Sequence, residues 1–133
     1  MSFLYYILFA GAVVALDQFT KYLTVANIAL YADVPFLPGI VQLTYVQNTG
    51  AAFSSFEGQQ WLFALVFAVF TGLLLWEYFK KPMPFSRFER LCIFAIYGGG
   101  LGNMIDRVRL GYVVDMIETE FMEFPVFNVA DCF

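Results

Sequence analysis

The chain has 133 residues, of which 61% are hydrophobic and 14% charged, and its formal net charge is −4. The core of one small domain could not shield this much apolar side chain from water, so the composition excludes an ordinary water-soluble fold. We therefore expect an α-helical integral membrane protein. No repeat, low-complexity tract or linker divides the sequence, and residues 1–133 should form a single domain.

Three apolar segments approach the length of about 20 residues that a membrane-spanning helix needs. They run from Phe3 to about Ala26, from Trp61 to Phe79 and from Leu91 to about Ile105. Four basic residues cluster between the second segment and the third: Lys80, Lys81, Arg87 and Arg90. No Lys or Arg occurs from Leu23 to Phe79. Because Lys and Arg favour the cytoplasmic side, the N-terminus should be cytoplasmic, and residues 24–60 and the chain after Arg107 should lie outside.

Two further segments have the pattern of short strands. Ile40–Gln47 alternates apolar and polar side chains, which is the period of a half-buried strand, and Asn48-Thr49-Gly50 follows as a turn. Tyr112–Ile117 is short, β-branched and apolar around one acid, which is again typical of a strand. After Pro125, residues 127–131 look like the approach to another helix.

The chain contains no histidine, which excludes Ser-His and Cys-His nucleophile pairs and His-ligated zinc from these 133 residues. Asp115 and Asp131 stand in apolar sequence, where burial would raise the pKa of either acid. Two such carboxyls brought together would share a proton, hold a water molecule and act as acid and base. The alternative is that one Asp lies at a strand edge and the other caps a helix.

Other polar residues accompany the predicted membrane helices. Asp17 and Lys21 stand four apart on one helix face and can form an ion pair, which inside lipid either is structural or lies close to a site. The small residues of Gly98–Gly102 favour close helix packing. Three polar residues follow at helical spacing and could form a network at the membrane surface: Asn103, Asp106 and Arg107.

Four sequence blocks, taken together, resemble the lipoprotein signal peptidases, also called signal peptidase II, which are membrane aspartyl proteases. The blocks are Asp17-Gln18-Phe19-Thr20-Lys21, Asn48-Thr49-Gly50-Ala51-Ala52-Phe53, the run from Gly98 through Gly102-Asn103-Met104-Ile105-Asp106-Arg107 to Gly111-Tyr112-Val113-Val114-Asp115, and Phe124-Pro125-Val126-Phe127-Asn128-Val129-Ala130-Asp131. They occur in the family's order and cover nearly the whole chain. The resemblance is therefore highly specific.

The resemblance implies four membrane helices, both termini in the cytoplasm and a small extracytoplasmic β-cradle beside the active site. The family's fourth helix follows the position of Asp131, whereas this sequence ends at Phe133. We therefore expect three helices here, with the fourth truncated. By matching positions, the resemblance also implies a catalytic pair, a set of residues that hold the substrate or the antibiotic globomycin, and a set that braces the site. The catalytic pair would be Asp115 and Asp131. The substrate-binding residues would be Asn48, Asn103, Arg107 and Asn128. The bracing residues would be Asp17, Lys21 and Asp106.

The implied reaction is hydrolysis of the peptide bond before a diacylglyceryl-modified cysteine in bacterial prolipoproteins, without a metal or organic cofactor. The implied partners are the prolipoprotein and membrane lipid, with no nucleic acid, and the protein should act as a monomer in the bacterial cytoplasmic membrane. Two other functions stay open. A Ser-Lys peptidase would use Ser54 or Ser55 with Lys21. A small multi-pass transporter would also carry acids in its helices, but nearer mid-membrane than Asp115 and Asp131.

Overall fold

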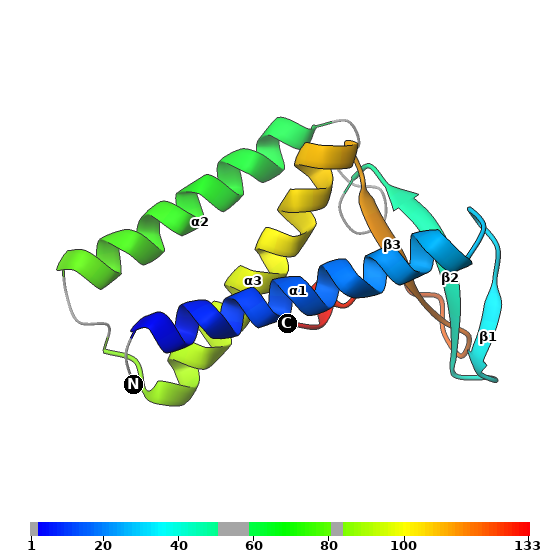
Figure 1. Cartoon of the computed structure of the whole chain (residues 1–133), viewed down its shortest axis with the longest axis horizontal. Helices are drawn as coiled ribbons and strands as arrows, with labels where there is room; N and C mark the ends of the chain where they lie inside the picture. Colours follow the sequence, from blue (N-terminus) through cyan, green and yellow to red (C-terminus); the bar gives the residue numbers. More distant parts are fainter. Residues whose placement is uncertain (1–2, 51–58, 81–83) are drawn as a thin grey trace.

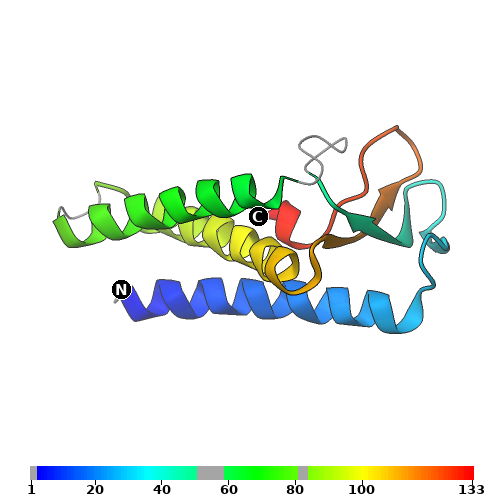
Figure 2. The ribbon, with the colours of Figure 1, turned by 90° about the horizontal axis from the view of Figure 1, so that it is seen from above.

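The computed structural model of the chain describes residues 3–50, 59–80 and 84–133. Its elements, in chain order, are the helix α1 (Phe3–Asn27), the strands β1 (Val34–Leu37) and β2 (Val41–Asn48), the helices α2 (Gln60–Lys80) and α3 (Arg87–Leu110), the strand β3 (Val113–Thr119) and the short 3-10 helix η2 (Ala130–Cys132). Three long helices form one part of the molecule, and a small sheet lies beside the last turns of α1 (Figures 1 and 2).

The three predicted helices are all present. Among the described residues, α1 and α2 are long and apolar enough to cross a membrane. Every residue of α2 is at least partly exposed, as expected of a helix that faces lipid. The third helix is longer than predicted at both ends, because Ser86 and Glu89 form a capping box at its start and Gly111, in the left-handed conformation, ends it.

Small residues allow α3 to pack closely against α1, as the sequence predicted. A Cβ atom on Gly98 would lie within 3.0 Å of the Ala10 carbonyl oxygen and of the Val13 side chain. Toward the start of both helices, Tyr6, Ala10 and Phe94 form a buried apolar cluster. The spacing between α1 and α3 is therefore fixed by contact between backbone and side chains.

The sheet is antiparallel, with strand order β1-β2-β3. The two predicted strands are confirmed, with β2 displaced by one residue and β3 by one or two residues. A bend follows β2 as predicted, and there the Gly50 backbone N–H donates to Oδ1 of Asn48 at 2.9 Å. Strand β1 was not predicted. It has four residues, all exposed, and Pro35 among them places it at an edge of the sheet.

The close packing of α3 on α1 predicts the effect of adding one methyl group. Gly98→Ala should force the helices apart and destabilise the protein by about 1–3 kcal/mol. Gly72→Ala is the matched control, because nothing lies within 4 Å of a Cβ at Gly72 and the change should be neutral or stabilising. Thermal unfolding in detergent measures both variants, and an equal midpoint for the two would contradict this account of the helix contact.

Candidate active site

Polar side chains from five parts of the chain meet around a hollow of about 350 Å³. The hollow lies where α3, the end of β2, β3 and the segment leading into η2 come together. Its lining includes six of the nine site residues expected from the sequence: Asn48, Asn103, Arg107, Asp115, Asn128 and Asp131. The remaining three, Asp17, Lys21 and Asp106, lie directly behind it, between α1 and α3.

Asp115 is the more buried of the two aspartates, with 2% of its surface exposed. Its Oδ2 accepts a hydrogen bond from the Asn48 side-chain amide at 2.8 Å, and its Oδ1 accepts one from the Asn128 side-chain amide at 2.6 Å. Burial raises the pKa of Asp115 to about 6, and the charge of Asp131 acts in the same direction, while the two amides oppose it. Asp115 can therefore hold a proton in mildly acidic conditions.

Asp131 is exposed and has a different set of donors. The side-chain amide of Asn103 donates to its Oδ1 at 2.8 Å, and the backbone N–H of Asn128 donates to its Oδ2 at 3.1 Å. Asn128 is fully buried. It donates to both aspartates, to Asp115 from its side-chain amide and to Asp131 from its backbone N–H. This one residue couples the positions of the two carboxyls.

A buried ion cluster lies behind the aspartates. The Lys21 ammonium contacts Asp17 Oδ2 at 2.9 Å, Asp106 Oδ2 at 2.9 Å and Asn103 Oδ1 at 2.8 Å. The predicted ion pair between Asp17 and Lys21 is confirmed, and Asp106 joins it from α3. The Oδ1 atom of Asp17 accepts from the backbone N–H of Ala130, and Oδ2 of Asp106 accepts from that of Val114, both at 3.1 Å.

These two backbone contacts have a common feature. Ala130 immediately precedes Asp131, and Val114 immediately precedes Asp115. Each carboxylate of the ion cluster therefore holds the chain one residue before one of the two aspartates. Lys21 joins the two carboxylates, so a single ammonium group links the anchor of Asp115 to the anchor of Asp131.

The structure adds two residues that the sequence did not single out. The Gln18 amide donates to Asp106 Oδ1 at 2.9 Å and to the Gly102 carbonyl at 3.2 Å, which ties α1 to α3 beside the ion cluster. The Gln60 amide donates to the carbonyls of Thr49 and Gly111 at 2.9 and 3.0 Å. A polar side chain inside an apolar helix is the one signal by which Gln18 could have been found.

Arg107 approaches the hollow from α3 and is held from two sides. Its Nη2 donates to the Gly50 carbonyl at 2.9 Å, and its guanidinium lies 4.2 Å from the centre of the Phe63 ring. Its Nε is buried and has no partner among the described residues. The side chain is thus fixed in place with one donor available to another group.

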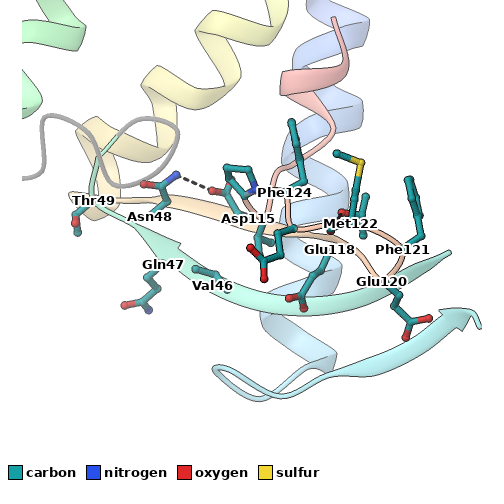
Figure 3. A pocket seen from close by; sticks show the side chains of 14 residues that line it. Val46, Gln47, Asn48, Thr49, Asp115, Glu118, Glu120, Phe121, Met122 and Phe124 are labelled. Carbon is teal, nitrogen blue, oxygen red and sulfur yellow. Dashed lines mark hydrogen bonds between the residues drawn. The ribbon is translucent and has the colours of Figure 1, made fainter. Parts of the chain in front are cut away.

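A second, larger hollow of about 980 Å³ adjoins the first. It is lined by β2, β3 and residues 120–126, and it shares Asn48 and Asp115 with the hollow around the aspartates. Figure 3 shows these two side chains bonded to each other at one end, with Glu118 and Glu120 toward the other. The second hollow therefore extends the space beside Asp115 along the sheet.

The described residues do not group three or more His, Cys, Asp or Glu side chains in a way that could hold a metal ion. What the site does offer is a buried carboxyl that can carry a proton beside an exposed carboxyl that can accept one. Together they can activate a water molecule and protonate a carbonyl oxygen. Ser54 and Ser55, the serines of the alternative Ser-Lys site, lie outside the described residues.

The comparisons with known proteins agree with this chemistry. The family model described as signal peptidase (SPase) II matches residues 9–133. A lipoprotein signal peptidase of Streptococcus pyogenes serotype M2 (strain MGAS10270) is 47% identical over 120 residues, which is 90% of this chain and 78% of that protein. One from serotype M5 (strain Manfredo) is 46% identical with the same coverage.

Two solved structures, both described as a bacterial membrane enzyme, have closely similar folds. Their TM-scores are 0.89 and 0.86, each at 32% sequence identity. Each alignment covers 98% of this chain, and 80% and 84% of the two solved chains respectively. With the family model spanning most of its length and relatives of this similarity, the chain belongs to the signal peptidase II family.

Proposed function

We propose that Asp115 and Asp131 are the catalytic pair with which this chain, as a lipoprotein signal peptidase, removes signal peptides from prolipoproteins. The observation that carries the proposal is the hydrogen bonding of Asn128 to both carboxyls, which holds them at one hollow. In keeping with the family, cleavage would occur just before a cysteine that carries diacylglycerol. The lipid would keep that cysteine close to the membrane and so to the site.

The surroundings of the two aspartates give them different roles. Burial raises the pKa of Asp115 to about 6 and so favours this carboxyl as the one that carries the proton, whereas Asp131 is exposed and open to water. The pair reacts from the state in which Asp115 holds the proton. Asp131 takes a proton from water as the water oxygen bonds to the scissile carbonyl carbon, and Asp115 gives its proton to the carbonyl oxygen. When the tetrahedral intermediate collapses, Asp131 passes its proton to the leaving nitrogen and Asp115 regains its own. The C–N bond breaks, and both carboxyls return to their starting states.

The asparagines orient this pair. Asn48, Asn103 and Asn128 each donate a side-chain amide to Asp115 or Asp131, so we assign them to positioning the carboxyls as well as lining the substrate hollow. Arg107 lines the hollow with its guanidinium held by the Gly50 carbonyl, so we assign it to binding the substrate there. Asp17, Lys21 and Asp106 brace the two backbone segments that carry the pair.

The alternative functions find less support. Lys21 is held by Asp17, Asp106 and Asn103, which uses all three hydrogens of its ammonium and leaves none for a serine nucleophile. A transporter would require its carboxyls in the middle of a membrane helix. The proposed carboxyls lie instead on β3 and η2. An acid pair that lines a hollow, with a larger hollow adjoining it, fits a peptidase.

We further propose that α3 crosses the membrane together with α1 and α2. Its charged residues lie in its first turn and its last two turns, and residues 91–105 between them are uncharged. With Lys80, Arg87 and Arg90 near the cytoplasmic end, the sheet and the site would face outward. The 133 residues then form one peptidase domain in a bacterial cytoplasmic membrane.

Removing either carboxyl tests the catalytic pair. Asp115→Asn and Asp131→Asn should each slow prolipoprotein cleavage by at least about 10³-fold, because each variant lacks one of the two proton-transfer groups. Membrane insertion and thermal stability should change little. Asp33→Asn, at an exposed aspartate away from the hollow, is the control and should cleave at the normal rate. Normal cleavage by either of the first two variants would exclude that residue from the chemistry.

Removing the ammonium tests the brace. Lys21→Met leaves two buried carboxylates without their counter-charge, so we expect a loss of about 3 kcal/mol or more in stability together with slower cleavage. Lys80→Met, at an exposed lysine over the Trp76 ring, should have a small effect. Thermal unfolding in detergent compares them. If Lys21→Met unfolded at the same temperature as Lys80→Met, the cluster would not be the support we describe.

Labelling with a membrane-impermeant thiol reagent tests the orientation. Cys92 and Cys132 are free and exposed, so both would first be replaced by serine. A cysteine introduced at the exposed Glu123 should then react from outside the cell, because the loop after β3 faces outward in the proposed arrangement. A cysteine at Arg87 should react only after the membrane is opened. Labelling in the reverse pattern would show that the proposed orientation is wrong.

A further inference from the structure

Five exposed apolar side chains gather at one end of the sheet. They come from two turns distant in the sequence, and their exposed fractions lie between 49% and 64%: Phe36, Leu37, Ile40, Phe121 and Met122. We call this set the apolar tip. Two of its residues, Phe121 and Met122, also line the hollow of about 980 Å³ that reaches Asp115. The turn between β1 and β2 and the turn after β3 lie together at the same end of the sheet (Figure 1).

Hydrogen bonds hold the two turns of the apolar tip together. The backbone N–H of Glu120 donates to the Ile40 carbonyl at 3.0 Å, and the backbone N–H of Gly39 donates to the Glu120 carboxylate. The Thr119 hydroxyl donates to the Met122 carbonyl at 3.0 Å, which shapes the second turn. Hydrogen bonds between the two backbone segments thus fix the arrangement of the apolar tip. Apolar side chains exposed together in this way mark a surface that binds a membrane or another protein.

The position of the apolar tip relative to α1 favours the membrane. Helix α1 has 25 residues and is about 37 Å long, whereas the hydrocarbon core of a bilayer is about 30 Å thick. In the proposed topology α1 begins at the cytoplasmic boundary, so its last turns reach the headgroup region on the outer side. The sheet lies beside these turns and not beyond them (Figure 2), and the Tyr31 N–H bonds the Tyr45 carbonyl at 2.8 Å, which joins the end of α1 to β2.

The lipid-facing surface of α1 also continues into the sheet. Tyr22, Leu23 and Val25 are exposed on the last turns of α1, and Leu30 and Tyr31 are exposed on the link to β1. No Lys or Arg occurs from Leu23 to Phe79, so the β1–β2 side of the apolar tip offers no cation for an anionic lipid headgroup. From this continuity and charge we propose that the apolar tip inserts into the outer part of the same bilayer that α1 crosses, through apolar contact alone.

Such insertion would tether the sheet at two places, the end of α1 and the apolar tip. Because β2 and β3 carry Asn48 and Asp115, the tether would fix the height of the site above the hydrocarbon. The inference rests on the exposed residues, the length of α1 and the proposed topology, and it does not depend on the chemistry proposed for the two aspartates.

Single-tryptophan reporters test the insertion. Trp61 and Trp76 would be replaced by phenylalanine, and one tryptophan introduced as Phe121→Trp or as Ile40→Trp. Each protein would be reconstituted in phosphatidylcholine vesicles with acyl-brominated lipid and, as the reference, without it. We expect bromine to lower the emission of both reporters by about twofold, as for residues in the headgroup–acyl boundary.

Adding anionic lipid should not strengthen the quenching of the reporters at 121 and 40, because residues 34–42 and 117–126 contain no Lys or Arg and two acids, Glu120 and Glu123, flank Phe121 and Met122. Quenching by aqueous acrylamide in place of brominated lipid would place the apolar tip in water and overturn the proposal. Protection from both quenchers would show that protein covers the apolar tip, either a second copy or another chain, and would overturn it equally. Two reporters in separate turns keep the test valid if one substitution disturbs folding.

Discussion

The ammonium of Lys21 is the group on which the rest of the site depends. It lies buried between α1 and α3, within 2.9 Å of carboxylates from both helices. Charges in such a place are costly unless they are paired and fully hydrogen-bonded. Here the two remaining carboxylate oxygens accept from the Gln18 amide and from the Ala130 backbone N–H. Loss of the ammonium would leave two uncompensated negative charges at the helix contact.

The same cluster explains how two aspartates from different elements come to one hollow. Asp115 is on a strand, and Asp131 is on a 3-10 turn that packs against α3. A Cβ on Gly99 would collide with the Ala130 carbonyl, so the absence of a side chain at Gly99 admits the segment that carries Asp131. The ion cluster then fixes the backbone before each aspartate, and Asn128 fixes the carboxyls themselves. Rigid backbone anchors suit a site whose chemistry depends on carboxyl spacing.

The sequence predicted the parts of the molecule whose physics is local. The apolar lengths of α1 and α2, the alternation in β2 and the small residues of α3 each have a period or composition that can be read along the chain. Strand β1 has no such signal, because its four residues are exposed and one is proline. It exists because β2 offers a partner edge.

The site likewise has features that the sequence predicted and features that depend on tertiary structure. Most of the nine site residues stand out in the sequence as polar groups in apolar surroundings, and resemblance to a family supplied their expected roles. The structure brings the residues together, and the roles stay predictions. The contact between Asp17 and the Ala130 backbone joins residues 113 apart, and no local pattern could have shown it. The double hydrogen bonding of Asn128 and the three acceptors of Gln18 depend in the same way on tertiary structure.

In the proposed pair, burial and the neighbouring charge of Asp131 favour Asp115 as the proton carrier. The most direct test is the carboxyl carbon NMR signal of Asp115, followed as pH is varied in the detergent-solubilised protein and assigned by its loss in Asp115→Asn. We expect a midpoint of about 6, lowered when Asp131→Asn removes the adjacent negative charge. A midpoint near the ordinary aspartate value of about 3.9, unmoved by that substitution, would contradict it.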